Sequence, residues 1–297
     1  MVAPLPARLL ALLALGVVSV AFSSILIRWA EAPAMSVAFW RNAMAAAILL
    51  PIALVRRRDE LRTLSRADWS TATLAGALLA LHFALWIPSL SYTTVAASTV
   101  LVTTQPVWVA LIGRAFGETV RRRTAVGIGL ALVGAVAISG GDFGVSTRAA
   151  LGDLLALGGA VAAAGYFLAG RRLRRKISLT TYVGVAYSTT AVILAVVVAA
   201  SGSPFFGFEP RVWAILVAMT LGPQIGGHTV FNYLLGHLEA GTVAIAVTGE
   251  PVVASILALL FFQEVPPWAA VAGGLVILTG IWVVISGQPG ARSAPAG

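Results

Sequence analysis

The chain has 297 residues, of which 59% are hydrophobic and 10% charged, with a mean hydropathy of +0.94 and a net charge of +9. A water-soluble protein, in which about a quarter of the residues are charged, could not cover this much apolar surface, and the positive charge lies in short bursts between apolar segments rather than in the patch that nucleic acid requires. Cysteine is absent, which excludes disulfides and thiolate metal sites. The three histidines lack a metal-ligand spacing, so no cofactor is expected.

Ten apolar segments are predicted to cross the membrane as helices, because each approaches the roughly 20 residues that span about 30 Å of hydrocarbon. They are residues 9–29, 36–55, 69–90, 94–115, 123–141, 150–170, 180–200, 211–234, 241–262 and 267–286. Runs such as Ala43–Leu50 are apolar without a break, whereas the strands of a membrane barrel alternate. The fold class is therefore an all-α integral membrane protein.

The first segment has two features of a cleaved signal peptide, namely Arg8 before the apolar run and small residues near Ala32–Ala34. Its run of about 20 residues is longer than an ordinary signal core. Segment 150–170 also matches it in the second half of the chain. We therefore expect the first segment to be retained as a membrane helix.

The second half of the sequence repeats the first. Gln105-Pro106 and Glu250-Pro251 are 145 residues apart. Pairs 146 residues apart are His82 with His228, Trp86 with Asn232, Glu118 with Glu264, Gly127 with Gly273 and Gly134 with Gly280. Five helices per half is an odd number, so the second copy enters the membrane upside down. We predict inverted five-helix repeats over 1–145 and 146–290 around a central cavity with alternating access, and a disordered tail over 291–297.

The basic residues set the expected orientation. Loops 56–66, 114–123 and 171–176, together with the tails, hold 16 of the 20 arginines and lysines. Cytoplasmic loops carry such an excess, so both termini are expected in the cytoplasm. Lys176 is the only lysine, and alanine is abundant, as in GC-rich bacterial genomes, which favours a bacterial inner membrane. In this orientation His82 is expected toward the outer side, His228 toward the inner side, and Gln105 and Glu250 near the midplane.

Glu250 is the most informative candidate for substrate binding, because ionisable groups inside hydrocarbon are costly and are usually functional. Pro251 removes a backbone hydrogen bond and loosens the helix beside it. A carboxylate there could receive an ammonium group or carry a proton, but it could equally be a hydrogen-bonded group that fixes helix packing. Gln105, before Pro106, is its uncharged counterpart and shares a helix face with Trp108; there, packing or cavity lining is favoured over direct chemistry.

Two histidines occupy equivalent places in the two halves. His82 and Trp86 are spaced i, i+4, as are His228 and Asn232, so each pair shares a helix face. A lone membrane histidine is usually a satisfied hydrogen-bonding group, but the duplicated spacing also predicts a cavity. The nearby aromatic residues would suit a substrate with a charge and an apolar body; they are Trp86, Trp108, Tyr166 and Tyr187.

Arg41 and the glycines are assigned structural roles. Arg41 lies a few residues inside the second helix, where its side chain could snorkel outward or pair with Glu31. A structural or gating role is favoured for Arg41 over substrate contact, and the same role is assigned to Pro106 and Pro251. Glycines seven residues apart in the last helix of each half allow close helix packing. They leave a subunit contact open, although a monomer is expected.

These features together resemble the drug/metabolite transporter superfamily, and within it the EamA family of ten-helix exporters, over residues 8 to 286. The resemblance is carried by Phe39-Trp40-Arg41-Asn42, the two proline segments, Glu118 and Glu264, and the glycines that follow. It implies ten helices around a central cavity and export of amino acids or other small metabolites. The cavity helices of that family would bear His82, Trp86, Gln105, Trp108, Tyr166, His228, Asn232 and Glu250.

The predicted function is export of amino acids, with aromatic and other bulky ones favoured, and not an enzymatic reaction. The sequence contains no phosphate-binding loop, so ATP-driven pumping by this chain alone is not expected. It also contains no nucleophile elbow, a catalytic signature. The first helix lacks the acid that the small four-helix drug pumps carry, so a proton-coupled multidrug mechanism is not expected. A carrier of nucleotide-sugars, nucleosides or drugs remains an alternative. An intramembrane enzyme using a histidine with Glu250 is a further one.

Overall fold

The computed structural model describes residues 5–93, 95–117, 119–138, 146–263, 265 and 268–286, and within these ranges it contains helices and no strands. Glu118, Glu264 and the predicted tail over 291–297 lie outside the described residues. The first half contains α1 (Ala7–Ala30), α2 (Ala34–Arg56), α3 (Arg58–Thr63), α4 (Arg66–Ser89), α5 (Val95–Val102), α6 (Gln105–Ala115) and α7 (Arg122–Ile138). The second contains α8 (Thr147–Arg174), α9 (Leu179–Ser201), α10 (Pro210–Met219), the π-helix η1 (Thr220–Thr229), α11 (Val230–Leu235), α12 (Ala240–Val247), α13 (Glu250–Phe262) and α14 (Trp268–Ser286).

Seven helical stretches of the described chain are long and apolar enough to cross a membrane. They are Ala7–Ala30, Ala34–Arg56, Arg66–Ser89, Thr147–Arg174, Leu179–Ser201, Pro210–Leu235 and Ala240–Phe262. The apolar helix Val271–Ser286 is shorter, and the predicted segment 94–115 is divided between α5 and α6. An all-helical, multi-pass membrane fold is therefore confirmed, whereas ten crossings stay a prediction.

Both prolines of the duplicated motif mark a break between two helices. The chain turns after α5 and after α12, and Gln105 and Glu250 are then the first residues of α6 and α13, each with proline directly after it. Proline suits the first turn of a helix, where its missing N–H is not needed. The side chains of Gln105 and Glu250 therefore project from helix N-termini, where the backbone dipole favours negative charge.

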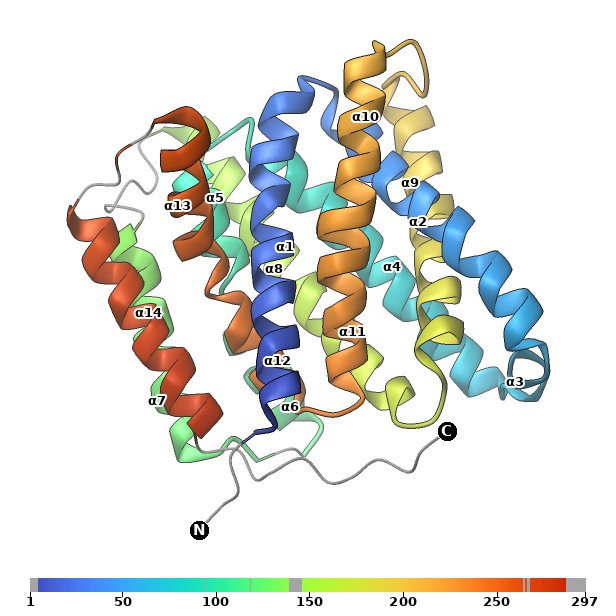
Figure 1. The fold of residues 1–297 in the computed structure, drawn as a ribbon, viewed down its shortest axis with the longest axis horizontal. Helices are drawn as coiled ribbons and strands as arrows, with labels where there is room; N and C mark the ends of the chain where they lie inside the picture. The colour runs from blue at the N-terminus through green and yellow to red at the C-terminus, as the bar shows by residue number, and fades with distance from the viewer. Residues whose placement is uncertain are drawn as a thin grey trace.

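Two pairs of helices at equivalent places in the two halves, α2 with α9 and α7 with α14, pack antiparallel. Along α2 and α9, Gly184 faces Ala53 near one end, while Ser36 Oγ donates to the Pro204 carbonyl 2.7 Å away at the other. Along α7 and α14, Gly127 meets Gly280 and Gly134 meets Gly273. The α7–α14 pair and the α2–α9 pair stand at opposite edges of the molecule, with α1 between them in the view of Figure 1.

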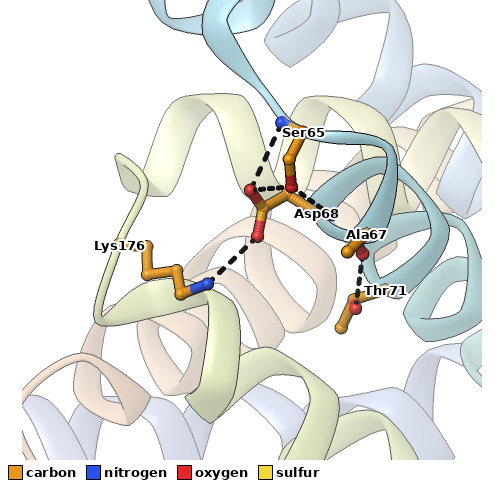
Figure 2. Close-up of polar contacts among 5 residues, drawn as sticks. All are labelled: Ser65, Ala67, Asp68, Thr71 and Lys176. Atoms are coloured by element: carbon orange, nitrogen blue, oxygen red, sulfur yellow. Dashed lines mark hydrogen bonds and ion pairs between the residues drawn. The ribbon is translucent and has the colours of Figure 1, made fainter.

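A group of polar contacts, which we name the polar clasp, joins the two halves at the end that carries α3. Ser65 caps α4 through a reciprocal pair of hydrogen bonds with Asp68. Asp68 also forms an ion pair with Lys176, with Nζ 3.4 Å from Oδ1 (Figure 2). Glu60 of α3 accepts hydrogen bonds from the Ser178 backbone and from Thr181 Oγ1, both at the start of α9. The α2–α4 connection is thus tied to the α8–α9 connection.

At the opposite end the two halves are joined by aromatic contacts, which we name the aromatic clasp. The connection between α9 and α10 lies over the start of α2, where Trp40 Nε1 donates to the Phe205 carbonyl at 2.6 Å. The ring of Phe205 packs edge-on against Phe39, and that of Phe206 against Trp40, with centroids 5.3 and 5.4 Å apart. At each end, a connection of one half thus lies on the second helix of the other.

The polar clasp gives a pH-dependent contribution to stability. Partial burial acts to raise the pKa of Glu60, but the hydrogen bonds from Ser178 and Thr181 outweigh it and hold the pKa below its ordinary value. A depressed carboxyl pKa stabilises the fold above the unfolded pKa of about 4.3, and this contribution disappears as the pH falls through the lower folded pKa.

We therefore expect Glu60→Gln to lower stability at pH 7 by about 1 kcal/mol, a value reduced for solvent screening. The difference from the unmodified chain should vanish in acid, as measured by thermal unfolding in detergent across pH. Asp59→Gln, a neighbour for which no contact with α9 is seen, is the control. A difference that persists unchanged below the folded pKa would contradict the role given to the Glu60 carboxylate.

Candidate functional site

A cavity lies between the two halves, and side chains of both halves line it. Its walls come from α1, α4, α5, α6, α8, η1, α11, α12 and α13. The positions open to the centre of a water molecule occupy about 30 Å³, which is room for roughly two waters. Six of the eight residues predicted for substrate binding line this space, namely His82, Trp86, Gln105, Tyr166, His228 and Glu250.

Three of these lining residues carry buried polar atoms that have no hydrogen-bond partner in the described part of the chain. The atoms are Trp86 Nε1, Gln105 Oε1 and His228 Nδ1. Buried polar groups in proteins are nearly always paired, because an unmade hydrogen bond leaves the desolvation cost uncompensated. Two of these atoms belong to the first half and one to the second, and all three residues line the same cavity. A polar ligand or water in the cavity can supply the missing hydrogen bonds.

The two histidines face each other across the cavity. His82 Nδ1 lies 3.0 Å from the Gly159 carbonyl, to which it donates, so the neutral ring presents its other nitrogen as an acceptor. Its ring stacks on Trp86 with centroids 5.8 Å apart. The rings of His82 and His228 are 6.3 Å apart, closer than the prediction of an outer and an inner histidine implies, because equivalent positions of the two halves converge on the centre.

Glu250 is the acidic group of the site. Its side chain is 6% exposed and projects from the first turn of α13 into the cavity. Gln105 occupies the equivalent place at the start of α6, and it is also buried and lines the cavity. The site therefore has one carboxylate and one amide, each at a helix N-terminus, where an oxygen is favourably placed.

Trp108 and Asn232 do not line the cavity. Trp108 is half-buried, packs against the main hydrophobic core and donates from Nε1 to Thr104 Oγ1 at 3.3 Å. Asn232 is fully buried behind the wall, where its amide donates to the hydroxyls of Tyr166 and Tyr187. Asn232 therefore holds the ring of Tyr166, which does line the cavity, instead of facing a substrate.

The expectation that Arg41 snorkels outward or pairs with Glu31 is wrong. Its side chain is fully buried, with Nε donating to Gln224 Oε1 at 3.0 Å and Nη1 to Ser23 Oγ at 2.9 Å. Glu31 is exposed. The side chain turns inward because polar groups of α1 and η1 receive the guanidinium, and its charge also lies over the ring of Phe83, 4.4 Å from the centroid.

Ser23 and Gln224 are functional candidates that the sequence interpretation missed. Ser23 lines the cavity, and Gln224 joins Arg41 to Asn42 by donating from Nε2 to Asn42 Oδ1 at 3.1 Å. A polar residue within an apolar span was the available signal for both. For Gln224 the signal was stronger, since it lies among Gly222, Pro223 and Gly226, which disrupt a regular helix.

The comparisons with known proteins agree with this architecture. Residues 8–140 and 150–286 each match the EamA-like transporter family. An "Uncharacterized transporter" of Archaeoglobus fulgidus is 27% identical over 265 residues, covering 87% of this chain and 90% of that protein. A solved crystal structure with 20% identity superposes with a TM-score of 0.77 over 94% of this chain and 96% of the other, which shows a shared fold. The chain is thus a multi-pass membrane protein that belongs to the EamA-like transporter family of the drug/metabolite transporter superfamily.

Proposed function

We propose that this transporter exports amino acids, with aromatic and other bulky ones favoured, or related small metabolites, across a bacterial inner membrane. The observation that carries the proposal is the small cavity between the halves, lined by Glu250 and by residues whose polar atoms have no hydrogen-bond partner in the described part of the chain. Glu250 or Gln105 contacts the polar head of the substrate, while Trp86 and Tyr166 pack against its apolar body. These aromatic walls exclude water from the side chain and favour bulky apolar groups.

The proposed ten helices form two inverted repeats, over 1–145 and 146–290. Two pairs of equivalent helices, α2 with α9 and α7 with α14, are antiparallel, as copies of opposite orientation require. The packing between the halves is also reciprocal. The third helix of the first half, α4, packs on α8, and the corresponding stretch of the second half, α10–η1–α11, packs on α1. Such repeats move around a central site to give alternating access.

The small cavity and the two clasps support this mechanism. The cavity has room for roughly two waters, far less than an amino acid needs. The two clasps join the first half to the second at opposite ends of the molecule. Transport therefore requires the helices to part. Opening the polar clasp would admit substrate from the cytoplasm, and opening the aromatic clasp would release it outside.

Counterflow in proteoliposomes tests the proposed substrate class. Purified protein, loaded with unlabelled amino acid, should accumulate labelled phenylalanine or tryptophan several-fold above empty liposomes. The panel should include a nucleoside, a nucleotide-sugar and an aromatic amine, the substrates of the competing carrier readings. Counterflow of one of these without any amino acid would overturn the proposal, and chemical conversion of a panel compound would favour an enzyme.

The proposed orientation can be tested with single cysteines, because the chain contains none of its own. A thiol at Arg62 of α3, near the polar clasp, should be protected from a membrane-impermeant reagent in intact spheroplasts. A thiol at Phe206 of the aromatic clasp, whose side chain is 67% exposed, should be labelled. Labelling should become equal after the membrane is permeabilised. The reverse pattern would place the termini outside.

A further inference from the structure

Two oppositely charged side chains are buried at this cavity. Among the aspartate, glutamate, lysine and arginine side chains of the described residues, only Arg41 and Glu250 are classed as buried, at 0% and 6% exposure. Removing a lone ion from water costs several kcal/mol, so each of them requires an opposite charge or a complete set of hydrogen bonds. Neither requirement is fully met within the described chain.

Arg41 is held firmly but incompletely. Its Nε and Nη1 donate to Gln224 and Ser23, and Asn42 in turn fixes the Gln224 amide. These partners are all neutral, and in the described ranges no carboxylate forms an ion pair with Arg41. The third nitrogen, Nη2, is buried without a hydrogen-bond partner. The guanidinium is thus positioned in advance, with one donor unpaired and no ion pair formed within the described residues.

This guanidinium lies directly behind the cavity wall. Ser23, which accepts from it, lines the cavity. The ring of Phe83 beneath it contacts the rings of His82 and His228, with centroids 4.9 and 5.4 Å away, and both histidines line the same cavity. Glu250 reaches the cavity from α13, on a different helix. Glu250 therefore lines this small space while Arg41 lies behind its wall, separated from it by Ser23, and the described residues show no ion pair between the two. Arg41 can meet a substrate only when the helices part, as transport requires.

We propose that Arg41 and Ser23 receive the carboxylate of an amino acid substrate while Glu250 receives its ammonium group, so that the pair selects a zwitterion. This inference rests on the proposed function and makes it more specific. The planar guanidinium suits a carboxylate, to which it donates two parallel hydrogen bonds. One cation cannot neutralise a diphosphate, and one anion alone would favour an amine; the two together match one positive and one negative group.

The test measures how well unlabelled compounds compete with the transport of labelled phenylalanine in proteoliposomes. The competitors are phenylalanine itself, phenethylamine, which lacks the carboxylate, and N-acetylphenylalanine, which lacks the charged amine. In the unmodified chain phenylalanine should compete at least tenfold better than either analogue. In Arg41→Gln its advantage over phenethylamine should fall roughly tenfold or more, the loss expected for a charge-assisted pair. Arg41→Lys, which keeps the charge without the fork, should retain part of the advantage. Arg28→Gln removes an exposed arginine of α1 and should change neither ratio.

A purely structural Arg41 would weaken all three compounds equally and leave the ratios unchanged, which would overturn the inference. If Arg41→Gln does not fold, two other measurements test the inference. They are the competition ratios in Arg41→Lys and the thermal stabilisation of the unmodified chain by phenylalanine and by phenethylamine. Equal stabilisation by phenylalanine and phenethylamine would overturn the inference, and greater stabilisation by phenylalanine would support it. Absence of amino acid transport by the unmodified chain would instead overturn the proposed function.

Discussion

Glu250→Gln is expected to lower amino acid counterflow by roughly tenfold or more while the protein stays folded. The substitution keeps the shape of the side chain and removes its negative charge, so it deletes the attraction for an ammonium group or the site for a proton. A hydrogen bond to a charged group contributes about 1.5–3 kcal/mol, which corresponds to a factor of ten to about a hundred in affinity. Gln105, at the equivalent place in α6, shows that the start of such a helix accommodates a buried glutamine.

The matched control is Glu209→Gln, which removes an exposed carboxylate just before α10. Both variants should elute as single species in detergent, and the control should transport at the unmodified rate. Equal transport by Glu250→Gln and the unmodified chain would remove this carboxylate from the mechanism. Loss of transport in both variants would show a general effect of charge and not a local one.

The helical class and the family were predictable because they depend on composition and order along the chain. A membrane span leaves a long apolar run, and a duplication leaves matched residues at one offset. Gln105 and Glu250, which that repeat singled out, both line the cavity. The pattern did not show that each proline would end one helix and begin another, because an uninterrupted apolar run is compatible with either outcome.

The orientation of individual side chains was not predictable from spacing alone. Trp108 shares a helix face with Gln105 in an ideal helix, but it packs on the core outside the lining of the cavity. The error for Arg41 has a different cause, because its direction depends on Ser23 and Gln224, which lie 18 and 183 residues away in sequence. Contacts between distant helices decide where a buried charge points, and a single sequence does not record them.

The ten-residue π-helix between α10 and α11 was also outside the reach of the sequence interpretation. It has no counterpart in α4, the equivalent helix of the first half, which is continuous from Arg66 to Ser89. A wide turn of this kind often marks a functional site. Here it places Gln224 against Arg41, and it carries His228, which lines the cavity as His82 of α4 does.

Gly134→Leu is expected to destabilise the protein by about 3 kcal/mol or more, because overpacking at a tight contact costs this much when backbone must move. A side chain at Gly134 would collide with the carbonyl oxygen of Gly273 and would lie 2.9 Å from the backbone nitrogen of Ile277. Neither atom belongs to a flexible side chain, so α7 and α14 would have to separate. Thermal unfolding in detergent should show the loss as a melting temperature lower by several degrees.

Gly129→Leu is the matched control on the same helix. A Cβ added there would meet no atom of another helix within 4 Å among the described residues, and the position is exposed. Leucine is a better helix former than glycine by nearly 1 kcal/mol, so this variant should be as stable as the unmodified chain or more so. Equal effects of the two substitutions would mean that the close glycine contact does not hold the last helix of one half against that of the other. The contrast between them therefore measures the packing of α7 on α14 separately from helix propensity.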